Sequence, residues 1–149
     1  AERASRAETG VLAGIAPGLP ALSRAAKLTR RAARVGFDWP DAAAVLDKLE
    51  EEAGELRAEL RNGGQAPDPE RLRDEVGDLL FVLANLARKL DLDPEDCLRG
   101  ANAKFERRFG HMEQSLAREG KTPSDLGLDA LEALWLAAKR AERGESPDA

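Results

Sequence analysis

The spacing of apolar residues in the middle of the chain constrains its fold more than any other feature. Between residues 46 and 60 they recur at alternating intervals of three and four, namely Leu46, Leu49, Ala53, Leu56 and Leu60. A second series follows the same rule, namely Leu72, Val76, Leu79, Leu83, Leu86 and Leu90. This period is that of a helix with one buried face. Two long helices are therefore predicted, over about 40–61, with Pro40 at the first position, and about 70–90.

Glycine and proline divide the rest of the chain into three further helices. We expect these over about 22–35, 94–119 and 129–143. Gly36 should end the first of them, because glycine readily adopts the left-handed conformation that follows a helix. Pro94 suits the first turn of the next, where its missing N–H is not needed.

The composition supports an all-α fold. Of 149 residues, 42% are hydrophobic and 34% charged, but only 4% are aromatic. This is typical of Ala/Leu/Glu/Arg helices, and the length suits one domain. We predict a bundle of about five helices over residues 11–143, with a linker or disordered lead-in at 1–10 and a frayed tail at 144–149.

Charge and cysteine content limit the possible functions and locations. The net charge of -5 argues against a protein that binds duplex nucleic acid. Cys97 is the single cysteine, so the chain has no intramolecular disulfide and no thiolate zinc site, as expected in a reducing cytoplasm. There is no apolar run of membrane length. The chain begins with Ala rather than Met, which is expected of a processed or excised piece.

Carboxylates lie beside both predicted apolar stripes. At about 100° per residue, Glu52, Glu55 and Glu59 fall on one edge of the first stripe. Glu75 and Asp78 repeat the spacing of three on the next helix, and the short loop between the helices predicts antiparallel packing. A sheltered carboxylate needs a compensating cation. The pattern therefore indicates an all-oxygen site for Mg²⁺ or Mn²⁺, with a solvated acidic face as the alternative.

The segment KFERRF has a physical interpretation of its own. Lys104 and Arg108 are four residues apart and share a helix face, while Phe105 and Phe109 form a pair that can pack inward. A cationic face beside a metal-loaded one suits a triphosphate. From these residues alone, phosphate binding and an ordinary solvated basic patch are both open.

Five motifs together resemble one known family. They are VGFDW at 35–39, DKLEEEAGEL at 47–56, DEVGDLLF at 74–81, NAKFERRF at 102–109 and LEALWLAAKR at 131–140. In this order and spacing, the chain from about 11 to 140 resembles the MazG-type nucleoside triphosphate pyrophosphohydrolases of the all-α NTP pyrophosphohydrolase superfamily. The resemblance implies Mg²⁺-dependent hydrolysis of NTPs and dNTPs to monophosphate and pyrophosphate, with broad base specificity and a role in nucleotide-pool control.

The resemblance also implies roles for individual residues. The metal ligands that it implies are Glu52, Glu55, Glu75 and Asp78, while Glu51 or Glu52 would orient or deprotonate the attacking water. The substrate-binding residues that it implies are Lys48, Arg71, Asn102, Lys104, Arg108, Trp135 and Lys139. Trp135 is also in register with a core, and Trp39 is either a plug at a helix entry, which we favour, or a platform for a base. We interpret His111 as a surface or core residue rather than a ligand.

Two other function classes are compared with the sequence pattern. A ferritin-like redox bundle needs Glu-x-x-His pairs, which the chain lacks. A non-catalytic dimerisation or nucleotide-binding half of a tandem protein remains the alternative to an enzyme. Gly77, Phe81 and Ala84 form a second apolar patch on the 70–90 helix, from which we predict at least a homodimer.

Overall fold

The computed structural model describes residues 10–144, which are helical throughout apart from turns and loops. The α-helices are α1 (Ala21–Ala33), α2 (Ala42–Arg61), α3 (Pro69–Lys89), α4 (Pro94–Ala117) and α5 (Leu128–Glu142), with short 3₁₀ turns η1 (Asn62–Gly64) and η2 (Pro123–Asp125). No strand occurs within the described range. The predicted all-α fold with five helices is confirmed. The predicted lead-in up to residue 9 and the tail from residue 145 lie outside the described residues.

The chain divides into two compact units, Ala1–Cys97 and Leu98–Ala149. The first holds α1, α2 and α3, and the second holds most of α4 together with α5. Among the described residues, no helix is both long enough and apolar enough to cross a membrane. The single domain predicted over 11–143 stays a prediction.

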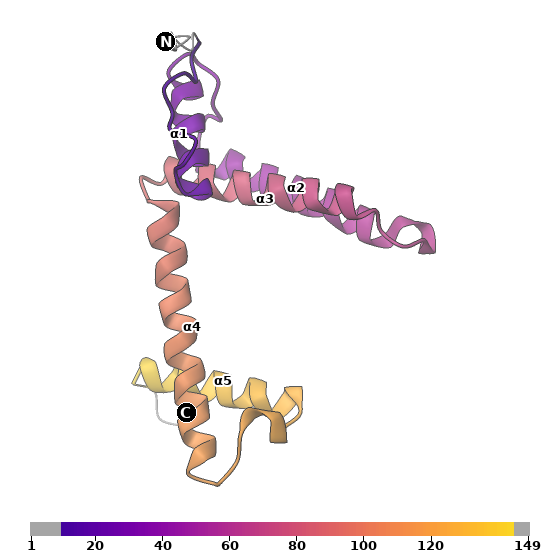
Figure 1. Cartoon of the computed structure of the whole chain (residues 1–149), viewed down its shortest axis with the longest axis vertical. Coiled ribbons are helices and arrows are strands. Elements are labelled where there is room, and N and C mark those ends of the chain that lie inside the picture. Colours follow the sequence, from indigo (N-terminus) through magenta and orange to yellow (C-terminus); the bar gives the residue numbers. More distant parts are fainter. Residues whose placement is uncertain (1–9, 145–149) are drawn as a thin grey trace, which may run out of the picture. The chain divides into compact units, whose positions relative to one another are not determined.

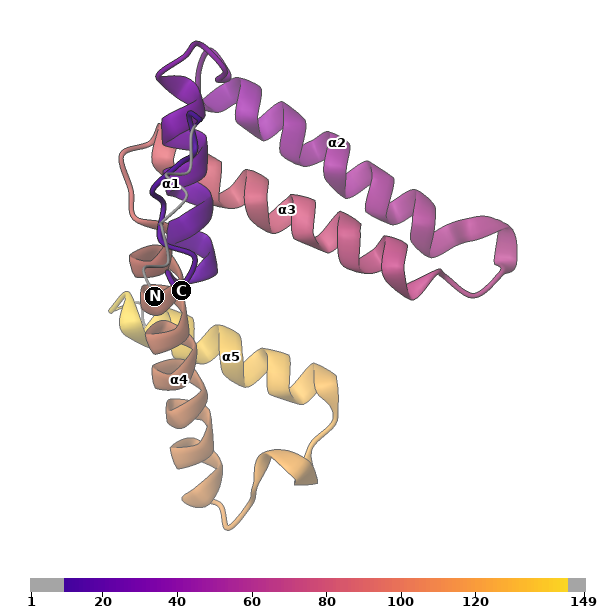
Figure 2. The ribbon, with the colours of Figure 1, turned by 45° about the horizontal axis from the view of Figure 1, so that its top comes forward.

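In the first unit, α2 and α3 form an antiparallel hairpin. Figures 1 and 2 both show the two helices side by side, with the chain reversing at η1. α1 packs against α3. Val45, Val82 and Ala84 are buried in this unit, together with Ala25 and Ala26 of α1. The hairpin holds the acidic residues of α2 and α3 on adjacent helices.

Local capping fixes where the helices begin. The Asp41 carboxylate accepts a hydrogen bond from the Ala44 N–H at 2.8 Å, so α2 begins at Ala42. Pro40 therefore precedes the helix, and its predicted place at the first helical position is wrong. Asp93 caps α4 in the same way, accepting from the Glu95 N–H at 2.8 Å.

The buried face of the α2–α3 hairpin differs from the predicted stripes. On α2, Leu46 and Leu60 are 47% and 56% exposed, whereas Val45 and Glu52 are buried. The α3 stripe is also partly open, with Val76, Leu83 and Leu90 exposed while Val82, Ala84 and Asn85 are buried. The reason is that α3 contacts both α1 and α2, which together cover a different sector of its surface from the one that periodicity selects.

The second apolar patch predicted on α3, from Gly77, Phe81 and Ala84, also differs from the structure. Ala84 is only 1% exposed, because it packs inside the first unit. Phe81 is 39% exposed, and the open apolar face of α3 runs instead along Val76, Leu80 and Leu83, which are 44%, 49% and 44% exposed. These three residues lie four and three positions apart, so they share one side of the helix.

In the second unit, α5 lies across α4 (Figure 1). Met112 and Leu116 of α4 and Ala138 of α5 are buried. The turn before α5 is closed by a capping box, in which Thr122 and Asp125 bond reciprocally.

Candidate functional site

Three carboxylates from the two helices of the hairpin converge. Glu52 of α2 and Glu75 and Asp78 of α3 each offer an oxygen, and these oxygens lie within 4.8 Å of one another. Glu75 and Asp78 share a face because they are three residues apart. The convergence of the two acidic edges follows the sequence prediction. We call these three residues the acidic cluster.

Within the acidic cluster, Glu75 lies in an unfavourable environment for a charged carboxylate. Its Oε2 atom is buried and has no hydrogen-bond partner. Burial raises the pKa of Glu75, and the charges of Glu55, Glu52 and Asp78 raise it further. A buried carboxylate oxygen without a donor is costly, and like charges add to the penalty. Glu55 thus acts on the cluster through its charge, although its oxygens are outside the set that lies within 4.8 Å.

The acidic cluster fits a hard divalent cation. Its donors are all carboxylate oxygens, which Mg²⁺ and Mn²⁺ prefer over the nitrogen and sulfur ligands of softer metals. The unpartnered Glu75 Oε2 supplies a lone pair that no protein donor uses. A cation here would also remove the repulsion that raises the pKa of Glu75.

Lys48 lies beside the acidic cluster. Its Nζ is 2.7 Å from Glu52 Oε1 and 3.1 Å from Glu51 Oε1. The hydrogen bond to Glu52, followed by that to Glu51, raises the pKa of Lys48, so the ammonium stays charged. The side chain of Glu51 is 59% exposed, whereas that of Glu52 is 8% exposed. Lys48 therefore connects the exposed carboxylate of Glu51 with the buried carboxylate of Glu52 in the cluster.

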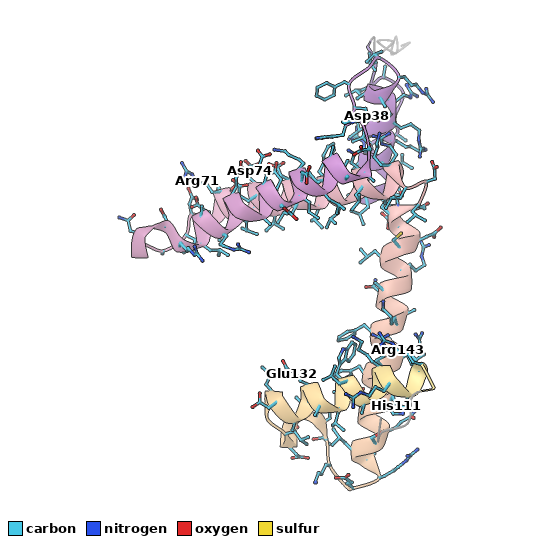
Figure 3. All side chains as sticks on the ribbon, turned by 180° about the vertical axis from the view of Figure 1, so that it is seen from behind. Asp38, Arg71, Asp74, His111, Glu132 and Arg143 are labelled. Carbon is cyan, nitrogen blue, oxygen red and sulfur yellow. The ribbon has the colours of Figure 1, made fainter. Side chains whose placement is uncertain are left out.

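Arg71, a predicted substrate-binding residue, contacts a carboxylate of α2. Its guanidinium pairs with Glu59 at 3.4 Å, and Glu59 also accepts from the Asp68 N–H. Figure 3 shows Arg71 and Asp74 along α3 of the hairpin. The side chain of Arg71 remains 72% exposed. Glu59 thus links the end of α2 to the start of α3 across the hairpin loop. It is not one of the three residues of the acidic cluster.

In the second unit, the structure brings Arg108 and Trp135 together. The guanidinium carbon of Arg108 lies 5.6 Å from the centroid of the Trp135 ring. Phe105 contacts the same ring, with centroids 5.4 Å apart, and stacks on Phe109 at 5.8 Å. Phe105 is 57% exposed, so its predicted inward packing is wrong. The rings instead form a partly open aromatic surface beside a cation.

The other predicted substrate residues also belong to the second unit. Asn102 and Lys104 are exposed on α4, and Lys139 is half-buried on α5, one turn after Trp135. The first unit contains all four predicted metal ligands and two predicted substrate-binding residues, Lys48 and Arg71.

Glu142 is a residue of this surface that the sequence did not predict. Its carboxylate accepts hydrogen bonds from the Nε–H groups of Arg107 at 2.6 Å and Arg108 at 2.8 Å. These bonds lower the pKa of Glu142, Arg107 contributing more than Arg108. One signal was available, because Glu142 lies seven residues after Trp135 and hence on the same face of α5.

The backbone of Trp39 is tied to the end of α3, and the role predicted for its ring stays a prediction. Lys89 Nζ donates to the Trp39 carbonyl at 2.7 Å, and the Trp39 N–H donates to Asp38 at 2.9 Å. Asp38 also pairs with Arg88 and Lys89. The segment before α2 is thereby tied to the end of α3. His111 of α4 is exposed (Figure 3).

Comparison with known proteins gives a consistent result. The MazG nucleotide pyrophosphohydrolase domain matches residues 41–112. The chain is 43% identical over 141 residues to the nucleoside triphosphate pyrophosphohydrolase of Escherichia coli (strain K12), covering 95% of this chain and 53% of that protein. It is 39% identical over 139 residues to the nucleoside triphosphate pyrophosphohydrolase/pyrophosphatase MazG of Thermotoga maritima, covering 93% and 52%.

A third relative is the uncharacterized protein YabN of Bacillus subtilis (strain 168). The identity is 41% over 136 residues, or 91% of this chain and 27% of that protein. The chain thus spans about half the length of the first two relatives, and less of the third. The matched domain includes the whole acidic cluster and the KFERRF segment. The chain belongs to the MazG family of nucleotide pyrophosphohydrolase domains.

Proposed function

We propose that this chain hydrolyses nucleoside triphosphates to nucleoside monophosphate and pyrophosphate with Mg²⁺. The observation that carries the proposal is the acidic cluster, with its unpartnered, buried Glu75 Oε2. Two relatives with 39% and 43% identity carry the name nucleoside triphosphate pyrophosphohydrolase, which supports the reaction type.

The proposed metal ligands are Glu52, Glu55, Glu75 and Asp78. When bound, Mg²⁺ would neutralise polyphosphate charge and acidify water. Lys48 forms a short ion pair with Glu52 and a second one with Glu51, so it holds both carboxylates beside the proposed metal site. In the proposed reaction the water oxygen bonds to phosphorus, its proton passes to the carboxylate of Glu51 or Glu52, and a phosphoanhydride P–O bond breaks. Pyrophosphate and the monophosphate then leave.

The proposed substrate contacts are cations, one amide and one ring. The cations are Lys48, Arg71, Lys104, Arg108 and Lys139, the amide is Asn102 and the ring is Trp135. Arginine binds phosphate with a planar fork of donors, and Arg108 is held against Trp135. An aromatic ring stacks on any base, which favours broad base specificity.

Product analysis tests this proposal. The purified chain is incubated with each common NTP and dNTP, with Mg²⁺ or with EDTA. We expect monophosphate and pyrophosphate only with the metal, and a fall in kcat of about 10²-fold or more for Glu52→Ala or Glu75→Gln, because each replacement removes a ligand. Glu50→Gln, on the same helix and exposed, is the matched control. Unchanged turnover in the two ligand variants would refute the proposed site.

The alternative function is a non-catalytic nucleotide-binding half of a larger protein. It is favoured by one observation, that the chain spans 53% and 52% of two relatives. Nucleotide binding without turnover in the same assay would establish it.

We also propose that the chain forms at least a homodimer. The support is the open apolar face of α3, formed by Val76, Leu80 and Leu83. Exposed apolar faces of this kind mark interaction surfaces, and a second copy of the same chain is the commonest partner.

A further inference from the structure

We propose that Glu142 is a positioning residue, which orients the guanidinium of Arg108 for the triphosphate. This inference rests on the proposed function, because Arg108 needs a fixed orientation only if it binds phosphate.

The first observation is which N–H group of each arginine donates to the Glu142 carboxylate. Glu142 Oε2 accepts from Arg108 Nε at 2.8 Å, while Oε1 accepts from Arg107 Nε at 2.6 Å. An arginine has five N–H donors, and the Nε–H is the one nearest the aliphatic stem. Because Glu142 takes the Nε–H, this contact does not use the two terminal amino groups of Arg108. Those groups form the fork that binds a phosphate.

The second observation is that Arg108 is held on a second side. Its guanidinium carbon lies over the Trp135 ring, 5.6 Å from the ring centroid. The side chain of Arg108 is only 15% exposed, compared with 60% for Arg107. A carboxylate at Nε and an aromatic ring beside the guanidinium carbon together restrict how the guanidinium can turn. Such preorganisation lowers the entropy that phosphate binding must overcome.

The third observation is the charge of Glu142. The hydrogen bonds from Arg107 and Arg108 hold its pKa below the ordinary value for a glutamate, so it is ionised at neutral pH. A single carboxylate shared by two guanidinium groups leaves a net positive charge. The pair therefore still attracts an anionic substrate.

Two other roles for Glu142 predict different outcomes. If Glu142 only fastened α5 to α4, its loss would lower the melting temperature and the active fraction, without changing KM. If it competed with phosphate for Arg108, its loss would strengthen substrate binding. An orienting role predicts weaker binding with little change in kcat.

The experiment measures kcat, KM and melting temperature for Glu142→Ala and Glu142→Gln in the full chain, with ATP and Mg²⁺. For Glu142→Ala we expect KM to rise about tenfold and kcat to stay within about twofold, as for a lost binding interaction. Glu142→Gln should recover part of this loss, because its amide oxygen still accepts from Nε–H. Arg107→Ala, which keeps the Glu142 to Arg108 bond, and Glu132→Gln on α5 are the controls (Figure 3).

A binding measurement separates this inference from the proposed reaction. The Kd of a non-hydrolysable ATP analogue is measured for the same variants by calorimetry. A wild-type chain that binds the analogue but does not turn over ATP would refute the enzyme, while a Kd weakened only in the Glu142 variants would still support the positioning role. An unchanged or tighter Kd and KM in Glu142→Ala, or a loss equal to that of Arg107→Ala, would overturn it.

Discussion

At the residue scale, the environment of Glu75 explains why the hairpin carries so many carboxylates. Burial and four neighbouring negative charges raise the pKa of this residue, and one of its oxygens has no donor. A raised carboxyl pKa means that folding favours the protonated form. This contribution to stability is fully present below the ordinary pKa of a glutamate and is lost as the pH rises through the higher folded-state pKa.

Replacement of Glu75 should therefore stabilise the metal-free chain. We expect Glu75→Gln to melt at a higher temperature than wild type at pH 7 in EDTA, because the buried charge is removed. The difference should shrink as the pH falls below the raised pKa, where wild-type Glu75 is protonated too. Thermal unfolding from pH 4 to pH 8 measures it, with Glu50→Gln as the control.

Addition of Mg²⁺ should reverse the order of the melting temperatures of wild type and Glu75→Gln. A ligand that binds only the folded state stabilises it, so the wild type should gain melting temperature with Mg²⁺ while Glu75→Gln gains little. An equal gain in both proteins would place the ion elsewhere.

At the scale of the element, the end of α1 depends on one backbone conformation. Gly36 has a φ of 89°, and the turn is closed by its N–H, which donates to the Ala33 carbonyl at 3.0 Å. A side chain at this position meets no neighbouring atom within 4 Å, so the penalty for adding one comes from the backbone alone.

A pair of glycine variants tests this interpretation. Gly36→Ala should lower the free energy of unfolding by about 1 kcal/mol, because alanine disfavours a positive φ. Gly54→Ala, in the interior of α2 with the same open space, should raise it by about 0.5–1 kcal/mol through helix propensity. Urea unfolding of both variants measures the difference, and the same sign in both would contradict the assignment of Gly36 to a left-handed cap.

The segment between α1 and α2 depends on Asp38. Its carboxylate pairs with Arg88 and Lys89, whose side chains are 9% and 16% exposed. Burial alone would raise the pKa of Asp38, but the hydrogen bonds and charges of these two cations outweigh it and lower the pKa. This contribution to stability is present above the ordinary carboxyl pKa and is lost as the pH falls through the lower folded-state value.

Removal of that carboxylate should destabilise the first unit. We expect Asp38→Ala to lower the free energy of unfolding by about 2 kcal/mol at pH 7, because Arg88 is left largely buried without its charge partner. The loss should diminish below about pH 4, the ordinary pKa of an aspartate, because the unfolded chain then binds a proton that Asp38 in the folded chain still lacks. Asp47→Ala, exposed on α2, is the control in urea unfolding at both pH values.

At the scale of the whole molecule, the open apolar face of α3 governs the expected assembly. Burying Val76, Leu80 and Leu83 against a second copy removes apolar surface from water. We expect the mass in solution, measured by light scattering at micromolar concentration, to be at least that of two chains. Leu80→Glu combined with Leu83→Glu should shift it to one chain, whereas Leu128→Glu, at an exposed position in α5, should not. A monomeric wild type would refute the dimer.

The helices and the acidic cluster were predictable from local rules. Helix starts such as that of α4 at Pro94 follow from residues within one turn of each end. The convergence of Glu52 with Glu75 and Asp78 follows from a spacing of three and a short loop, because together they limit how two helices can pack.

The sequence by itself thus determined the all-α class, the helix order and the acidic face of the hairpin, which depend on neighbours within a few residues. Only the tertiary structure decided which stripe is covered, leaving Leu83 exposed and Ala84 buried. It also decided that Glu142 meets Arg107 and Arg108, which are 35 and 34 residues away along the chain. Periodicity reports which side chains share a face, but burial and pairing depend on what packs against that face, and no spacing within one helix encodes its neighbour.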